Sequence, residues 1–192
     1  MLGDIADIRI GLVITRKKAR NDSETKAKYK LITLKNIELD SSFNDEEFEF
    51  FNSTEILSEE YLTEEGDILM RMSEPHTAVY IDKTKKDLLI PSYFAIIKVK
   101  DSKFLPEYVA WYLNTSKIKK EIKRNQTGGT VILISISNIG ELNIENIPIE
   151  KQNNIIKINN LKSKELKLIT KLIEEKEKLY NAINESFIKV NY

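Results

Sequence analysis

Hydrophobic residues follow one uninterrupted pattern over the last part of the chain, residues 148–192. There they recur at intervals of three and four residues, which is the spacing of one face of an α-helix. The resulting stripe, broken only at Lys176, consists of Leu166, Ile169, Ile173, Tyr180, Ile183, Phe187 and Val190. This pattern predicts a single long helix over residues 148–192.

A second apolar stripe runs beside the first and widens the hydrophobic face of this predicted helix. It consists of Leu161, Leu168, Leu172 and Leu179. Roughly 40 residues rising about 1.5 Å each form a rod on the order of 60 Å long, and no other predicted helix in the chain is long enough to cover it. Because an apolar helix face is normally buried, we expect this helix to pack against a partner in a coiled coil.

The first 147 residues show shorter patterns of both kinds. Period-two alternation and apolar runs predict strands within residues 2–13, 29–37, 68–71, 77–81, 88–99, 131–136 and 142–149. Pro106 begins a predicted helix over residues 106–114, and Ser116 can cap a second helix that continues through Ile122. We therefore predict an α+β fold: a mixed α/β globular domain over residues 1–147, followed by the long helix as a separate dimerisation and spacer element.

Polar stretches interrupt these patterns. Residues 16–30 are basic and lack a sustained period, which predicts a loop. Residues 40–51 alternate phenylalanine with carboxylates, so some of the rings must be buried. Residues 53–62 predict a short helix or turn, and Pro91 predicts irregular or edge pairing for the strand around it.

Charge is segregated along the chain, although the chain as a whole carries no net charge. Residues 1–36 hold 9 basic and 4 acidic residues, residues 37–67 hold 12 acidic residues and no basic one, and residues 83–124 hold 11 basic and 4 acidic residues. Such segregation can place positive charge on one face of the folded domain, where it would attract nucleic acid. The alternative is that opposite charges interleave after folding.

The basic segments fit contact with DNA phosphates, where lysine and arginine gain affinity by releasing counterions. Reading of bases would need a few polar side chains in loops or at strand ends. The candidate DNA-binding residues are Arg16, Lys17, Lys18, Arg20, Lys28, Arg71, Ser73, Gln126, Thr127 and Thr130. Taken singly, a lysine on a protein surface is more often just solvated than in contact with DNA.

Motifs for catalysis are weak in this sequence. It has no phosphate-binding Gly-Lys loop, no G-x-G-x-x-G after a strand and no cysteine, so thiolate chemistry is excluded. Glu121-Ile122-Lys123 has the spacing of metal-dependent nucleases, but chance explains that triplet in a chain rich in lysine and glutamate. The single histidine, His76, fits a loop or surface position better than a general base. We predict no catalytic residue and no metal site.

No apolar run approaches membrane length and no signal peptide opens the chain. We therefore expect a cytoplasmic protein without a membrane partner.

Several short motifs stand in a characteristic order. They are Leu2-Gly3-Asp4-Ile5, Gly11, Gly66-Asp67-Ile68-Leu69, Ser92, Phe94-Ala95-Ile96-Ile97, Leu105-Pro106-Glu107-Tyr108-Val109, Trp111-Tyr112-Leu113, Gly128-Gly129-Thr130, and Ile147-Pro148-Ile149 with Lys151-Gln152 and Ile155. In order and spacing the chain resembles one repeat of the specificity (S) subunit, HsdS, of type I restriction-modification systems. One such repeat comprises a target recognition domain and a conserved helix.

The resemblance implies a non-catalytic subunit that reads one half of a bipartite sequence in double-stranded DNA. Its helix would space two recognition domains and dock the methyltransferase (modification) subunits. Methylation and cleavage would belong to partner subunits, together with S-adenosylmethionine, magnesium and ATP, and this chain would hold no cofactor.

Full-length members of that family carry two repeats whose helices pack antiparallel, so a chain with one repeat would be a half-length form. We expect a homodimer with two-fold symmetry that reads inverted half-sites, about 17 base pairs apart at most. The expected dimer interface consists of Leu166, Ile169, Ile173, Tyr180, Ile183 and Phe187. The alternative is a half-length fragment that pairs with a full-length S subunit and alters or blocks its specificity.

Overall fold

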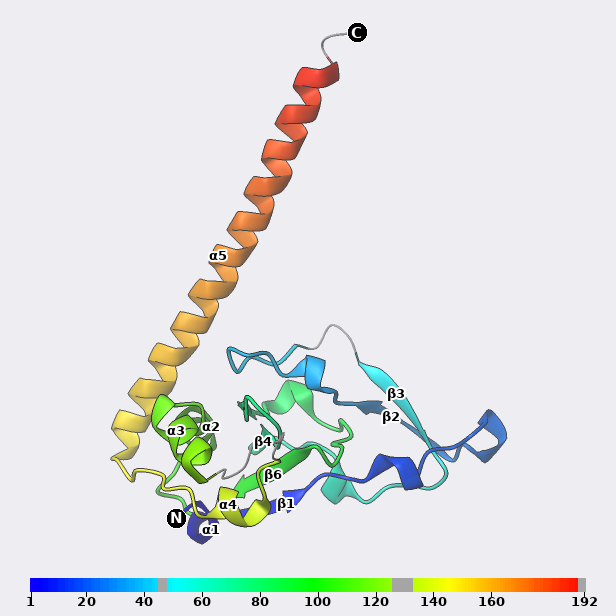
Figure 1. Cartoon of the computed structure of the whole chain (residues 1–192), viewed down its shortest axis with the longest axis vertical. Coiled ribbons are helices and arrows are strands. Elements are labelled where there is room, and N and C mark those ends of the chain that lie inside the picture. Colours follow the sequence, from blue (N-terminus) through cyan, green and yellow to red (C-terminus); the bar gives the residue numbers. More distant parts are fainter. Residues whose placement is uncertain (45–47, 126–132, 190–192) are drawn as a thin grey trace. The chain divides into compact units, whose positions relative to one another are not determined.

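The structure is a computed structural model that describes residues 1–44, 48–125 and 133–189. The chain forms two compact units, Met1–Asn153 and Asn154–Tyr192 (Figure 1). The first unit holds two sheets and the short helices, and the second consists of the greater part of helix α5 (Ile149–Lys189). Among the described residues, no helix is both long and apolar enough to cross a membrane.

A four-stranded antiparallel sheet lies at the centre of the first unit. Its order is β1 (Ala6–Ile10), β6 (Phe94–Val99), β4 (Asp67–Arg71) and β5 (Ala78–Tyr80). Ile97 of β6 lies opposite Ile8 of β1 on one side and Ile68 of β4 on the other. Successive side chains of a strand point to opposite faces, and residues 94–97 are all buried, so both faces of β6 are covered.

The strand predicted over residues 88–99 is regular only in its second half. Before Phe94 the chain makes single bridges, from Leu89 to Leu31 and to Leu62, and from Pro91 to Leu12. Pro91 has no N–H to give to a ladder, and its carbonyl instead accepts the N–H of Phe94 at 3.1 Å. The irregular pairing predicted around this proline is confirmed.

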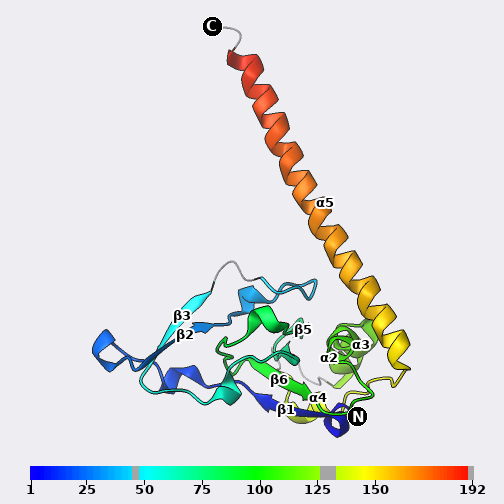
Figure 2. The same ribbon diagram turned by 180° about the vertical axis from the view of Figure 1, so that it is seen from behind.

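Helices α2 (Pro106–Leu113) and α3 (Ser116–Asn125) occupy the predicted positions, and α2 packs against β4 and β5. Figure 2 shows the two helices from behind. Asn114, directly after α2, bonds to both backbone groups of Ala78: its Oδ1 accepts the N–H at 2.9 Å and its Nδ2 donates to the carbonyl at 2.6 Å. The side-chain amide thus replaces a neighbouring strand at the edge of the sheet.

Two predicted strands are wrong in their described parts. Within residues 131–136, the described segment begins a short helix, α4 (Ile136–Gly140), whose cap Ser135 accepts the N–H of Asn138 at 3.1 Å. Residues 142–148 have no regular structure. Leu142 is nevertheless buried, as is Ile139 of α4, because α4 packs against α1 (Leu2–Ile5) and β1 and leaves Leu142 just beyond its end.

Strands β2 (Ala27–Leu31) and β3 (Glu49–Ser53) form a separate two-stranded antiparallel sheet, called the ribbon below (Figure 1). Tyr29 lies opposite Phe51 on its inner face, within a hydrophobic cluster that includes Leu31 and Leu89. The predicted boundaries were wrong here: the loop ends at residue 26, and the strand ends at Leu31, because residues 34–36 form a 3₁₀ turn closed by Asn36.

Short 3₁₀ turns fill the connections of the first unit. They are η1 (Ile14–Arg16), η2 (Asp22–Glu24), η3 (Leu34–Asn36), η4 (Glu59–Tyr61) and η5 (Lys83–Lys85). Of the phenylalanines in the acidic segment, Phe51 is buried and Phe43 and Phe48 pack at the edge of the core, as predicted for part of this set. Phe50 is the exception, with 61% of its surface exposed.

Candidate nucleic-acid interface

The first basic loop lies along the ribbon. The N–H of Ala19 donates to the carbonyl of Asn52, and the N–H of Thr54 donates to the carbonyl of Lys17, each at 2.9 Å. Lys18 forms a single antiparallel bridge with Ser53 at the end of β3. These backbone contacts hold residues 17–19 beside β3, so the loop and the ribbon share one edge of the first unit.

The predicted DNA-binding residues of this loop differ in how free their charges are. Arg16, Lys18 and Arg20 are exposed. Lys17 is partly buried, and its Nζ lies 2.6 Å from the Oε1 of Glu55. Of these four predicted residues, three are therefore exposed cations, and the fourth is already paired.

Lys28, the fifth predicted residue, lies on the outer face of the ribbon. In β2 it alternates with the inward residues Tyr29 and Leu31, and it lies opposite Asn52 of β3. Its Nζ is 4.4 Å from the centre of the Phe50 ring, a cation–π contact that orients the lysine without neutralising it. Lys30, one pleat further along β2, lies opposite Phe50 and places its Nζ 5.6 Å from the Phe48 ring.

Arg71 and Ser73 belong to a different part of the first unit, where β4 leads into the turn before β5. Both are partly buried, and the Nε of Arg71 has no hydrogen-bond partner among the described residues. The N–H of Ile134 donates to the carbonyl of Met72 at 2.9 Å, so the segment after residue 132 is held against this turn. The remaining predicted residues, Gln126, Thr127 and Thr130, lie outside the described residues, as does the whole of the glycine motif.

His76 lies in this same turn, so its predicted loop position is confirmed, but its side chain is buried rather than at the surface. Its backbone has a φ of +53°, and its carbonyl accepts a hydrogen bond from the Nζ of Lys119 in α3. Burial lowers the pKa of His76 below its ordinary value and lowers the pKa of Lys119 to about 8. The amine of Lys119 ties α3 to the turn between β4 and β5.

The candidate nuclease triplet does not build a metal site. Glu121 is partly buried in α3, whereas Lys123 is exposed, and residues two apart on a helix do not face each other. Over the described ranges, no group of three histidine, cysteine or acidic residues is placed to hold a metal ion.

A charged cluster at the start of β4 was missed by the sequence analysis. The carboxylate of Asp67 is fully buried: its Oδ2 accepts the N–H of Glu64 at 2.8 Å, and its Oδ1 lies 3.9 Å from the Nζ of Lys98. Burial raises the pKa of Asp67 despite this lysine. The cluster fixes the turn that contains Gly66, whose φ is +94°, and this role is structural.

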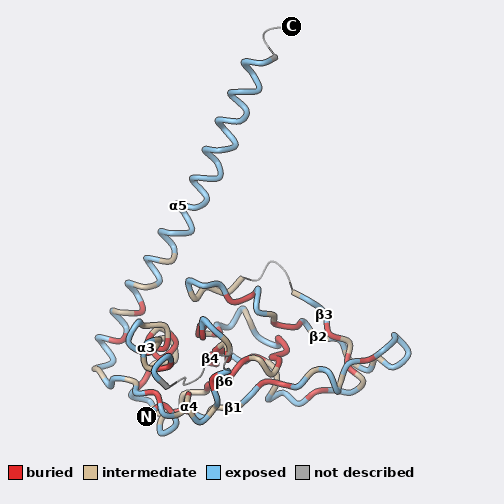
Figure 3. The backbone as a smooth tube through the Cα atoms, in the orientation of Figure 1, coloured by how far each residue is buried: buried red, intermediate tan, exposed pale blue. Residues whose placement is uncertain are grey.

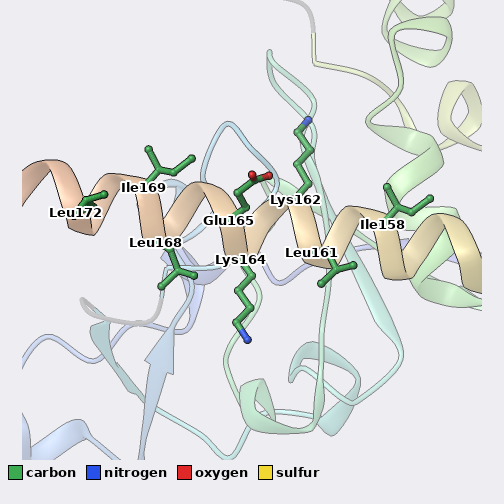
Figure 4. A pocket seen from close by; sticks show the side chains of 8 residues that line it. All are labelled: Ile158, Leu161, Lys162, Lys164, Glu165, Leu168, Ile169 and Leu172. Carbon is green, nitrogen blue, oxygen red and sulfur yellow. The ribbon is translucent and has the colours of Figure 1, made fainter.

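Helix α5 presents an exposed apolar surface in the second unit (Figure 3). All six residues of the expected dimer interface are exposed, at 40–69% of their surface: Leu166, Ile169, Ile173, Tyr180, Ile183 and Phe187. In the part of α5 nearest the first unit in sequence, the apolar surface includes residues on two sides of the helix. Leu161 and Leu168 lie on one side, and Ile158 and Ile169 lie on another (Figure 4). Lys162, Lys164 and Glu165 flank them.

No family model matches the sequence, and no curated protein matches it. The solved structures do provide matches. The crystal structure of the HsdS subunit from Thermoanaerobacter tengcongensis aligns with 89% of this chain at a TM-score of 0.63 and 11% sequence identity. The chain has the fold of an HsdS subunit. The predicted likeness and the predicted α+β architecture with a long C-terminal helix are thereby confirmed at the level of the fold.

Two further matches come from type I restriction-modification systems. A chain from a study of complex assembly and conformational transition of the type I restriction-modification system aligns at a TM-score of 0.58 and 14% identity, over 88% of this chain and 38% of that chain. The S subunit of a type I restriction-modification system from M. genitalium aligns at a TM-score of 0.55 and 14% sequence identity, over 92% of this chain and 41% of that chain. This chain also covers 43% of the Thermoanaerobacter subunit, so it spans less than half the length of each of the three.

Proposed function

We propose that this chain is a DNA sequence-recognition subunit of a type I restriction-modification system. The observation that carries the proposal is the HsdS fold, which extends over 89% of the chain but over only 43% of the matched subunit. One recognition domain and one helix would correspond to half of a specificity subunit. The first unit would read one half of a bipartite site in double-stranded DNA.

The exposed surface of α5 supports the pairing part of the proposal. Side chains such as Ile173 and Phe187 leave more than half of their surface in water, although burying one of them would stabilise a complex by about 1.5–3 kcal/mol. A second copy of the same helix, running antiparallel, would cover the stripe and place two recognition domains in a two-fold arrangement. The stripe that contains Leu161 and Leu168 would remain for the methyltransferase subunit.

The proposed chain is non-catalytic. Methylation and cleavage would take place on partner subunits, which would also bind S-adenosylmethionine, magnesium and ATP. This chain would contribute the choice of sequence and the spacing of the two half-sites.

The test is a selection from a random-sequence DNA library with the full chain, alone and assembled with a methyltransferase subunit. We expect the assembled complex to enrich an interrupted palindrome. Enrichment of no sequence would refute the proposal.

The same exposed stripe also fits the helix of a complete S subunit, which gives the second candidate function, a fragment that alters or blocks the specificity of its partner. Sedimentation of the isolated chain separates the two. A stable dimer supports the self-sufficient subunit, whereas a monomer that binds an S subunit supports the fragment.

A further inference from the structure

The outer face of the ribbon combines positive charge with an exposed ring and an unused amide. Lys28 and Lys30 are exposed at alternate positions of β2, opposite Asn52 and Phe50 of β3. The side-chain amide of Asn52 makes no hydrogen bond to any other described residue, although Asn52 is only partly exposed. Its backbone carbonyl accepts the N–H of Ala19, so the backbone at Asn52 is held in place while the side-chain amide is left to bond to a ligand.

The core does not require these side chains. Tyr29, Leu31 and Phe51 alternate with them and carry the packing on the inner face. Phe50, whose ring lies under the amine of Lys28, therefore contributes little to folding, because it keeps 61% of its surface in water. The same side chains are well suited to a ligand that carries negative charge and also presents the edges of stacked flat rings.

Charge favours duplex DNA as that ligand. Residues 16–30, which comprise the loop beside β3 and most of β2, hold seven basic residues against the two acidic residues Asp22 and Glu24. The major groove is about 12 Å wide and admits a two-stranded ribbon, whose strands are about 4.8 Å apart. Five residues at about 3.4 Å each give the ribbon a length of roughly five base pairs.

We propose that the ribbon enters the major groove with Asn52 and Phe50 as base-reading residues and with Lys28 and Lys30 as phosphate contacts. This inference rests on the proposed function and assigns specificity to residues that the sequence analysis did not select. The amide of Asn52 can donate a hydrogen bond to N7 of adenine and accept one from its N6 amino group. Phe50 offers apolar contact to a thymine methyl group.

The experiment measures base preference for the full chain in the complex that selects DNA. Asn52→Ala should reduce the ratio of affinities for the preferred base over the other bases at one position by about 5- to 150-fold. Asn52→Asp should shift the preference at that position toward cytosine. Phe50→Ala should weaken the preference for thymine at a neighbouring position. Asn143→Ala and Leu39→Ala, which alter exposed residues of the same unit, are matched controls and should leave the selected sequence unchanged.

The lysines are tested by affinity rather than by preference. Lys28→Ala and Lys30→Ala should weaken binding to all sequences alike and should each reduce the salt slope by about 1, whereas Lys103→Ala, at another exposed lysine, should not. Thermal melting shows that each variant is folded.

Two results would overturn the inference while leaving the proposed function intact. One is a wild-type complex with a clear preference that both ribbon variants, Asn52→Ala and Phe50→Ala, retain in full. The other is unchanged affinity and salt slope in the lysine variants, which would point to an acidic protein as the ligand of this face. A wild-type complex without any preference would instead refute both the proposed function and the inference.

Discussion

The side-chain amide of Gln152, fully buried in the first turn of α5, holds the backbone at Leu105, where α2 begins. Its Oε1 accepts the N–H of Leu105 at 2.8 Å, and its Nε2 donates to the carbonyls of Lys103 and Ile147 at 2.7 and 2.8 Å. Three backbone groups, from the segment before α2 and from the segment before α5, thus meet at one amide. The arrangement explains physically why a glutamine follows Pro148 at this distance.

Replacing this amide should destabilise the first unit. Gln152→Glu keeps an acceptor for Leu105 but places a buried carboxylate oxygen against the carbonyls of Lys103 and Ile147, so we expect a loss of about 3–5 kcal/mol in the free energy of unfolding at neutral pH. Gln152→Met loses all three bonds without adding charge and should cost about 2–4 kcal/mol. Urea denaturation of the full chain measures both, and Lys151→Ala at the exposed neighbouring position should change little. An unchanged midpoint for Gln152→Met would contradict this interpretation.

Gly11 should tolerate no side chain. A Cβ at this position would lie 2.3 Å from the carbonyl oxygen of Pro91 and 2.5 Å from that of Ile90, and backbone oxygens in the core cannot swing aside. Gly11→Ala should therefore destabilise by about 3 kcal/mol or more. Gly66→Ala is the informative comparison: its φ of +94° is unfavourable but nothing lies within 4 Å of the new Cβ, so about 1–2 kcal/mol is expected. A lower denaturation midpoint for Gly66→Ala than for Gly11→Ala would exclude the steric explanation.

Lys119 should make stability depend on pH in the alkaline range. Burial lowers its pKa to about 8 in the folded protein, against an ordinary value of 10.5, so the unfolded chain binds more protons between these two values. Stability should therefore rise from about pH 8 to pH 10.5 relative to a variant without this amine. The measurement is the difference in unfolding free energy between wild type and Lys119→Met across that range. A difference that does not change with pH would contradict the lowered pKa.

Pairing through α5 should fail when charge is placed in the first stripe. Ile173→Glu with Ile183→Glu would bury unpaired carboxylates between the helices, so we expect a monomer in sedimentation and an unchanged melting transition of the first unit. Asn160→Glu with Ala182→Glu is the matched control, because at 100° per residue both positions lie opposite the stripe. A double variant that still sediments as a dimer would place the interface elsewhere.

The paired state of Lys17 predicts unequal effects within the basic loop. Arg16→Ala should weaken DNA binding and reduce the salt slope by about 1, whereas Lys17→Ala should do less because its charge is already engaged by Glu55. Glu55→Gln would release Lys17 and should raise the affinity for all sequences. Filter binding at several salt concentrations measures the slopes, and equal effects at Arg16 and Lys17 would show that the ion pair does not persist.

The helices were predictable from the sequence because their signals are local. Pro106 at a first turn and the long apolar period of α5 placed both helices within about one residue of their observed starts. Strand boundaries were harder, because 3₁₀ turns such as residues 34–36 interrupt runs that look extended. The strand predicted from residue 29 onward contains the last three residues of β2, whereas Ala27 and Lys28 fell in the basic segment that was predicted as a loop.

The contacts that build the candidate interface had no local signal at all. Nothing in the residues around Asn52 indicates that its backbone receives Ala19 from a loop more than thirty positions earlier. The bonds of Gln152 and Asn114 are equally dependent on tertiary structure, because each side chain reaches backbone groups more than thirty residues away. Such partners are defined only once the chain has folded.

The two-residue period of the ribbon separates two evolutionary pressures on adjacent positions. Inward residues such as Tyr29 and Phe51 are constrained by packing in the core, whereas outward residues such as Lys28, Phe50 and Asn52 are not. Substitution on the outer face can therefore change what the ribbon contacts at almost no cost to folding. A lineage could acquire a new target by drift at alternate positions of two short strands, with the rest of the domain left untouched.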